Sequence, residues 1–218
     1  MVPGGPSRHT QTSWQRAAAD AGVRFVNVSP VRDDAAAELG ARWLPLRPGT
    51  DTALMLALAH VLITEGLADT DFATRCCTGF DRFRAHVLGH DTPAGGGAPE
   101  HAAVSGGVAK DPEWAERITG VPAADVRALA RDIAAHRTVI NLAWSIQRHH
   151  HGEQPYWAGI ALAALSGSCG LPGGGPAGGL GIAEHGTRGH WRIAALPQVP
   201  GGAVGRIPVA RIADMLLS

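Results

Sequence analysis

Side chains able to bind a polar ligand are concentrated in three short segments of this sequence. They are Ser29, Pro30 and Arg32; Gly49, Thr50 and Asp51; and the polar run from Trp144 to Gln154. An aspartate carboxylate offers two acceptor oxygens side by side, which match the adjacent donors on the Watson–Crick edge of guanine. An arginine guanidinium can bind a phosphate through two parallel hydrogen bonds or stack on a base. These residue types therefore predict a nucleotide site.

Each segment also has a simpler interpretation. Thr50 or Asp51 could only cap a helix that begins there, which is a common role for such residues. Arg32 could be an ordinary solvated arginine. The consecutive histidines His149–His151 could indicate a metal, but neighbouring residues point in different directions, so one ion cannot easily take all three. We expect a polar loop with one functional histidine and no metal ligand.

Predicted strands lie directly before all three segments. The branched and aromatic residues at 23–28 and the short run 43–46 indicate strands, and the nearly continuous apolar run 138–144 indicates one covered on both faces, inside a sheet. Helices alternate with these strands, so we expect an α/β fold with a mostly parallel sheet flanked by helices. Ligands bind beyond the carboxyl ends of such strands, and the three loops should open on one edge.

Helices are predicted from apolar periodicity and from residues that start or stop helices. The strongest begins at Asp51, where Leu54, Leu58, Val61 and Leu62 fall on one face before Gly66. An N-cap aspartate followed by proline starts another at 112–119. The predicted helices cover 12–21, 33–39, 51–65, 69–77, 81–88, 112–119, 123–135 and 155–168.

Composition excludes several classes of protein. The charges of nineteen basic and nineteen acidic residues cancel, so the chain has no net positive charge that would attract nucleic acid or an anionic membrane. No apolar run is long enough to span a bilayer, and the amino terminus lacks the pattern of a signal peptide. We expect a cytoplasmic chain, or a periplasmic one if an intact parent carries an export signal. The three cysteines form no disulfide framework and are predicted to be buried thiols.

Several motifs resemble, in order, those of molybdopterin oxidoreductases of the dimethyl sulfoxide reductase family, closest to its biotin sulfoxide and trimethylamine N-oxide reductases. They are Phe25–Asp34, Trp43–Met55, Gly79–Phe83, Trp144–Arg148, His151–Gln154, Gly170–Gly175 and Ile207–Leu216. The resemblance implies a Rossmann-like dinucleotide-binding variant of the α/β fold over residues 1–175. It also implies a loop and the truncated start of a second α/β domain over 176–218.

The same resemblance implies a cofactor and roles for residues. Mo-bis(molybdopterin guanine dinucleotide) would serve the intact parent enzyme, which would reduce a small S-oxide or N-oxide. Ser29, Pro30, Arg32, Gly49, Thr50, Asp51, Ser145, Gln147 and His151 would contact the cofactor, while Arg148 and Trp144 would act at the substrate funnel. The serine that ligates molybdenum would precede residue 1, so this chain alone is predicted to be inactive.

Three functional hypotheses follow. The chain is a fragment of an S-oxide or N-oxide reductase that works with the missing domains of its parent. Alternatively, it is a non-catalytic α/β module that binds a nucleotide or a partner, or an inactive remnant of a split gene. Titration with a guanine nucleotide separates the first two hypotheses from the third.

Overall fold

A computed structural model describes residues 15–91 and 107–178 of the chain. All of these belong to one compact unit that spans Met1–Gly186. The motif at Ile207–Leu216 and most of the second predicted region, 176–218, lie outside the described residues. The division into two domains therefore stays a prediction.

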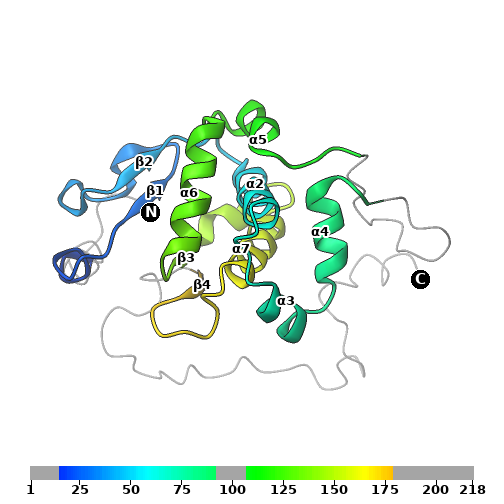
Figure 1. Cartoon of the computed structure of the whole chain (residues 1–218). Coiled ribbons are helices and arrows are strands. Elements are labelled where there is room, and N and C mark those ends of the chain that lie inside the picture. Colours follow the sequence, from blue (N-terminus) through cyan, green and yellow to red (C-terminus); the bar gives the residue numbers. More distant parts are fainter. Residues whose placement is uncertain (1–14, 92–106, 179–218) are drawn as a thin grey trace, which may run out of the picture. The chain divides into compact units, whose positions relative to one another are not determined.

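The described residues form an α/β arrangement in which helices predominate (Figure 1). Residues 15–20 are helical, and the further helices are α2 (Asp51–Thr64), α3 (Thr70–Cys76), α4 (Phe80–Leu88), α5 (Pro112–Thr119), α6 (Ala123–Ala135) and α7 (Glu153–Leu165). Its strands are β1 (Val26–Val28), β2 (Arg42–Leu44), β3 (Val139–Leu142) and β4 (Gly175–Gly178). Three short 3-10 turns are η1 (Arg32–Asp34), η2 (Ala37–Leu39) and η3 (Trp144–Arg148). No helix in the described ranges is long and apolar enough to cross a bilayer.

Local capping sets both limits of α5. The Asp111 carboxylate accepts a hydrogen bond from the Trp114 amide at 2.7 Å, and Gly120 ends α5 with a φ of 78°. The predictions for α5 and α6 are confirmed. The helix predicted at 33–39 is wrong, because the chain makes two 3-10 turns there. Seven residues are too few for a stable helix without strong packing.

The core is built around α2, which packs against α4, α5, α6 and α7 (Figure 1). The four apolar residues predicted to face inward are buried, and Ala53, Met55, Ala57 and Ala59 are buried as well. The helix is thus enclosed on nearly all sides, as expected for one that is apolar around its whole circumference. The predicted loop before α2 and the predicted loop before α7 are therefore attached to helices that pack against each other in this core.

The strands form two separate parallel pairs, β1 with β2 and β3 with β4. Parallel pairing is confirmed, but the single sheet that we predicted is not found among the described residues. The prediction that 138–144 lies inside a sheet is also wrong for this part of the chain. Among the described strands β3 pairs only with β4, and Val139 is 43% exposed. Helix α7 covers one face of β3, and no described element covers the other.

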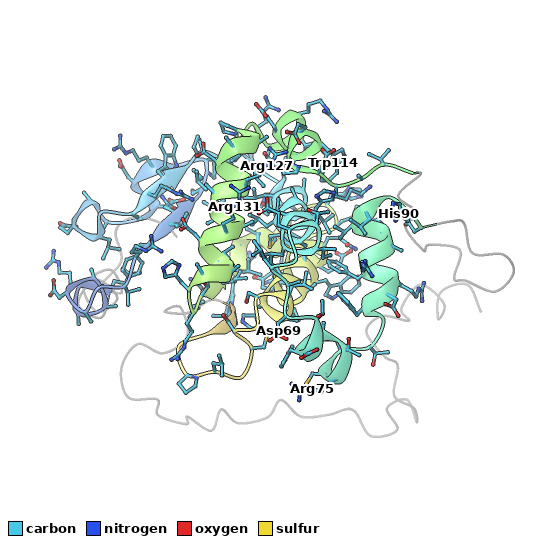
Figure 2. The ribbon with its side chains drawn as sticks, in the orientation of Figure 1. Asp69, Arg75, His90, Trp114, Arg127 and Arg131 are labelled. Carbon is cyan, nitrogen blue, oxygen red and sulfur yellow. The ribbon has the colours of Figure 1, made fainter. Side chains whose placement is uncertain are left out.

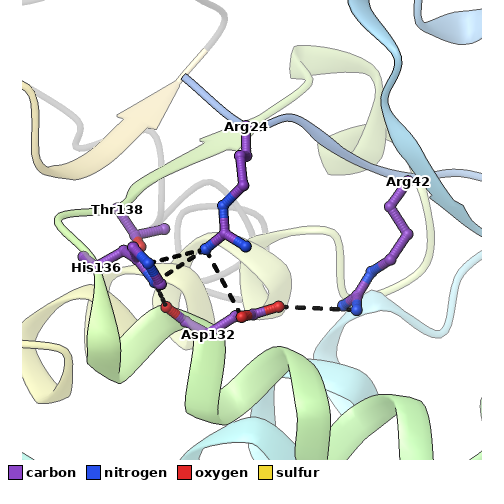
Figure 3. A network of polar contacts seen from close by, with 5 residues as sticks. All are labelled: Arg24, Arg42, Asp132, His136 and Thr138. Atoms are coloured by element: carbon purple, nitrogen blue, oxygen red, sulfur yellow. Dashed lines mark hydrogen bonds and ion pairs between the residues drawn. The ribbon is translucent and has the colours of Figure 1, made fainter. Parts of the chain in front are cut away.

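Charged side chains tie the strand pair and the helices to α6. Arg24 and Arg42, from before β1 and from β2, both lie 3.7 Å from carboxylate oxygens of Asp132 on α6, and Arg24 also contacts the His136 ring (Figure 3). Nearer the start of α6, one guanidinium nitrogen of Arg127 donates to both carboxylate oxygens of Glu113. Arg131 makes a bidentate pair with Glu65, and Figure 2 labels both arginines. Because these side chains are partly exposed, the pairs add little to stability.

Candidate functional site

A pocket of about 210 Å³ lies where two of the predicted loops meet. One wall is Gly49, Asp51 and Thr52, and the other is Ile146, His149–Gly152, Gln154 and Pro155. The two walls are almost one hundred residues apart in the sequence. The structure therefore brings together two of the three loops that we expected to share one edge of a sheet, although β2 and β3 belong to different sheets.

Asp51 is the carboxylate at this pocket. It is the first residue of α2 and is half-buried. Burial raises the pKa of Asp51, while a hydrogen bond with its own backbone amide and the charge of nearby His149 oppose the rise. No described side chain neutralises the carboxylate directly. Apart from the hydrogen bond with its own amide, its oxygens are therefore left to meet donors from a ligand.

The capping alternative for Thr50 and Asp51 is not supported. Thr50 occupies the N-cap position of α2, but its side chain makes no capping hydrogen bond. The Thr50 hydroxyl instead donates to the carbonyl oxygen of Arg47 at 2.7 Å. Asp51 is already inside the helix, so neither side chain accepts a hydrogen bond from the second or third helical amide, which is the defining contact of an N-cap.

Arg47 holds the loop before α2 in place. Its guanidinium donates to the carbonyl oxygens of Arg117 and Ile118, at 2.8 and 3.1 Å, near the carboxyl end of α5. Its backbone amide donates to the Thr119 carbonyl oxygen at 3.0 Å. A cation at a helix carboxyl terminus also complements the helix dipole. Arg47 is thus a structural residue that fixes Gly49 and Asp51 relative to the helical core.

The opposite wall is a tight turn between η3 and α7. His151 has a φ of 55°, the left-handed region that residues other than glycine seldom adopt. The rings of His150 and His151 lie 3.9 Å apart, tilted by 50°. The next residue, Gly152, approaches the backbone of Gln147 so closely that a Cβ atom would overlap its carbonyl oxygen. This approach sets the position of all three histidines.

Polar groups at the pocket favour a polar heterocycle. Residues from the first turns of α2 and α7 line it (Asp51, Thr52, Gln154 and Pro155), so the amino-terminal ends of two helices adjoin the pocket beside the Asp51 carboxylate. His149 and His150 add polar rings from the facing loop. Within residues 15–91 and 107–178, no cluster of His, Cys, Asp or Glu has a geometry that could hold a metal ion.

Four residues predicted to contact the cofactor or the substrate lie on η3, which adjoins the pocket, but they do not line its wall. Trp144, Ser145, Gln147 and Arg148 are all exposed. Their side chains make no hydrogen bond or ion pair with the described part of the chain. The segment is anchored instead through the Tyr156 hydroxyl, which donates to the Ala143 carbonyl oxygen at 2.9 Å. These side chains are free to contact a ligand.

The structure does not bring the first predicted segment into the pocket. The Ser29 hydroxyl is buried and donates to the Asp34 carboxylate, while it accepts from the Val31 amide at 3.1 Å. The side chain of Ser29 thus closes its own turn. Pro30 and Arg32 are exposed and do not line the pocket. Cofactor contacts by these three residues stay a prediction.

Several lining residues were missed by sequence reasoning. They are Thr52, Ile146, His149, His150, Gly152, Gln154 and Pro155. All are neighbours of predicted residues, so only their position in the run could have indicated them. The cysteines differ from expectation too: Cys76 is exposed, and Cys77 and Cys169 are half-buried. Burial raises the pKa of Cys169, helped by the nearby Cys77 thiol.

Comparison with known proteins gives consistent matches. The molybdopterin oxidoreductase family profile matches residues 7–204. The biotin sulfoxide reductase of Cereibacter sphaeroides is 42% identical over 99% of this chain and 27% of its own length. The dimethyl sulfoxide/trimethylamine N-oxide reductase of the same organism is 38% identical over 96% of this chain and 25% of its own length. The trimethylamine-N-oxide reductase of Haemophilus influenzae is 33% identical over 90% of this chain and 24% of its own length.

A solved structure agrees with these sequence matches at the level of the fold. Acetylene hydratase from Pelobacter acetylenicus superposes with a TM-score of 0.59 at 24% identity, covering 75% of this chain and 20% of that protein. The chain spans about a quarter of the length of the curated relatives it matches. Since the family profile covers most of the chain and these relatives align with nearly all of it, the chain belongs to the molybdopterin oxidoreductase family.

Proposed function

We propose that this chain is a segment of a molybdenum-dependent S-oxide or N-oxide reductase that contributes the guanine-nucleotide and substrate-funnel side of a bis(molybdopterin guanine dinucleotide) site. The observation that carries the proposal is the meeting of the Asp51 loop and the histidine loop in one pocket. The names of the three relatives described above support the reaction class. In this proposal the described strands belong to a Rossmann-like dinucleotide-binding domain.

The pocket fits one end of such a cofactor. Its volume of about 210 Å³ is below the roughly 300–1,000 Å³ usual for a site that encloses a whole drug-sized ligand. A base-sized heterocycle is therefore the appropriate occupant, with the rest of the dinucleotide outside the pocket. Asp51 would accept two hydrogen bonds from guanine, and the converging helix amino termini would favour the polar ligand.

The proposed reaction takes an S-oxide or N-oxide, two electrons and two protons to a sulfide or amine and water. When bound, the cofactor supplies the oxygen-atom transfer, and the protein positions and tunes it. The role of this chain is to bind and orient. Arg148 would donate hydrogen bonds to the oxide oxygen of the substrate, and the exposed indole of Trp144 would form an apolar side of the funnel.

Calorimetric titration of the purified chain with GDP, and separately with ADP, tests the nucleotide part of the proposal. We expect GDP to bind with a Kd between about 1 µM and 1 mM, which corresponds to roughly −8 to −4 kcal/mol. ADP should bind at least about tenfold more weakly, because adenine lacks the paired donors that a carboxylate recognises. Equal binding of both nucleotides would favour the general binding module, and no heat with folded protein would favour the remnant.

Arg148→Ala tests the substrate side in a complete enzyme. The appropriate protein is a chimera in which this chain replaces the segment that it matches in the Cereibacter sphaeroides biotin sulfoxide reductase, called here the reductase chimera. We expect kcat/KM for the oxide to fall about 10- to 100-fold, because a charge-assisted hydrogen bond is lost. Molybdenum content, measured by mass spectrometry of the metal, should be unchanged.

Arg75→Ala is the matched control for Arg148→Ala. Arg75 is an exposed arginine on α3 (Figure 2), outside the pocket wall. Its removal should change neither rate nor metal content. If Arg148→Ala retained the full rate, or lost molybdenum in proportion to its rate, the substrate role of Arg148 would be wrong.

A further inference from the structure

Helix α7 exposes large apolar side chains on one face. Trp157 is 63% exposed and Ile160 is 54% exposed, and the two are three positions apart, so they lie on the same side of the helix. After Glu153 the helix contains no charged residue. Ala158, Leu162 and Leu165 on its inner side belong to the core that surrounds α2. The helix is therefore apolar on both its inner and its outer face.

The strand that packs on α7 is also incompletely covered. Leu142 of β3 packs so closely on Gly159 that a Cβ atom there would lie 2.6 Å from a Leu142 methyl group. Trp157, two positions earlier, lies about 200° around the helix axis from Gly159 and so faces away from β3. Val139 is exposed on β3 itself. The layer formed by β3 and α7 thus has uncovered apolar side chains on opposite sides.

This pattern is typical of elements from the interior of a larger protein. Helices that are apolar all round are buried in the cores of large proteins, and parallel strands are normally covered on both faces. Exposed apolar surface next to a buried core marks a contact with another protein surface. The outer face carries no charge after Glu153, so it offers nothing that recognises an anionic or a cationic partner.

We propose that the outer faces of α7 and β3 are the surfaces on which the rest of a full-length reductase polypeptide packs, whether in the same chain or as a separate one. This proposal rests on the proposed function. Its support is that the relatives match this chain with only 24–27% of their length, so a polypeptide several times larger adjoins the matching region in them. One second copy of this chain, related by a two-fold axis, would cover one side of the layer and leave the other exposed.

Hydroxyl-radical footprinting with peptide-level mass spectrometry measures the exposure of Trp157 directly. Oxidation of Trp157 should be rapid in the isolated chain and at least about tenfold slower in the reductase chimera, as expected for a side chain in the centre of an interface. Trp114 is the matched control: it is half-buried on α5 with the Lys110 ammonium 5.3 Å from its ring, and its oxidation rate should be the same in both proteins. The same measurement on the helix that aligns with α7 in the unmodified relative gives the answer if the chimera does not fold.

Substitution of the face provides a second test. Trp157→Glu should lower the soluble yield of the reductase chimera severalfold and leave that of the isolated chain unchanged or higher. Val108→Glu, at an exposed apolar residue before α5, should have neither effect. Equal oxidation of Trp157 in both proteins would overturn the proposal, as would protection in the isolated chain together with a dimeric mass in light scattering. Footprinting requires neither molybdenum nor nucleotide, so its result is independent of the GDP titration.

Discussion

Asp51→Asn is expected to weaken GDP binding about 10- to 100-fold, the loss associated with hydrogen bonds to a charged group. The amide keeps one acceptor oxygen and replaces the other with a donor, which meets the exocyclic amine of guanine, also a donor. Xanthine has a carbonyl oxygen at that position. The same variant should therefore prefer xanthosine diphosphate over GDP, and paired titrations with the two nucleotides measure this reversal.

The stability of the Asp51 variants separates a ligand role from a capping role. Loss of a true N-cap costs about 0.5–2 kcal/mol. Because no hydrogen bond links the Asp51 carboxylate to the second or third amide of α2, the contact that defines an N-cap, and because burial of its charge raises its pKa, Asp51→Asn and Asp51→Ala should leave Tm nearly unchanged or raise it. A marked fall in Tm for both variants, with unchanged nucleotide selectivity, would show that Asp51 serves the helix and not the ligand.

The raised pKa also predicts the pH dependence of binding. The pKa of Asp51 is higher in the folded chain than in the unfolded chain. The stability of the ligand-free fold therefore decreases as pH rises from the unfolded-state pKa to the folded-state pKa, because the buried carboxyl group becomes charged. Guanine needs the ionised carboxylate, so GDP affinity should fall as pH decreases below the raised pKa, at a higher pH than for an ordinary aspartate. In Asp51→Asn this loss of GDP affinity at low pH should be absent when Kd is measured as a function of pH.

Gly152→Ala is expected to have the largest effect on the architecture of the site. The added Cβ atom would overlap the backbone carbonyl of Gln147, which is not a flexible side-chain end and cannot easily move aside. Such overpacking typically destabilises by about 1–3 kcal/mol, and for a chain of this size Tm falls by roughly 2–4 °C for each kcal/mol. The turn that carries His149–His151 must also shift, so GDP affinity should fall. Thermal unfolding and titration report the two effects.

Gly159→Ala is the matched control because Gly159 lies in α7, the helix that Gly152 precedes, and is likewise buried and crowded, but is not in the pocket wall. Its Cβ atom would meet the side chain of Leu142, which can rotate. We expect a smaller loss of Tm and unchanged GDP affinity in the folded protein. If the two alanine variants altered GDP affinity equally, the site would depend on global stability and not on the turn at Gly152.

The family resemblance and the helices were accessible from the sequence because their signals are local. Asp111 caps α5 through an amide three residues away, and left-handed glycines follow α2 and α5 directly. Periodicity indicated the buried side of α2 but not that the helix is enclosed on its other sides. Enclosure depends on α4, α5, α6 and α7, whose packing no local pattern encodes.

The sequence by itself determined the α/β class, most helix limits and the membership in a family of molybdopterin enzymes, because capping, periodicity and ordered motifs act over a few residues. Tertiary structure alone decided that the strands form two pairs, that Val139 is exposed, and that Ser29 closes its own turn while Arg47 caps α5. It also decided that Asp51 meets the histidine turn across almost one hundred residues. That contact depends on how α2 and α7 pack, and the packing is set by the shapes of many side chains together.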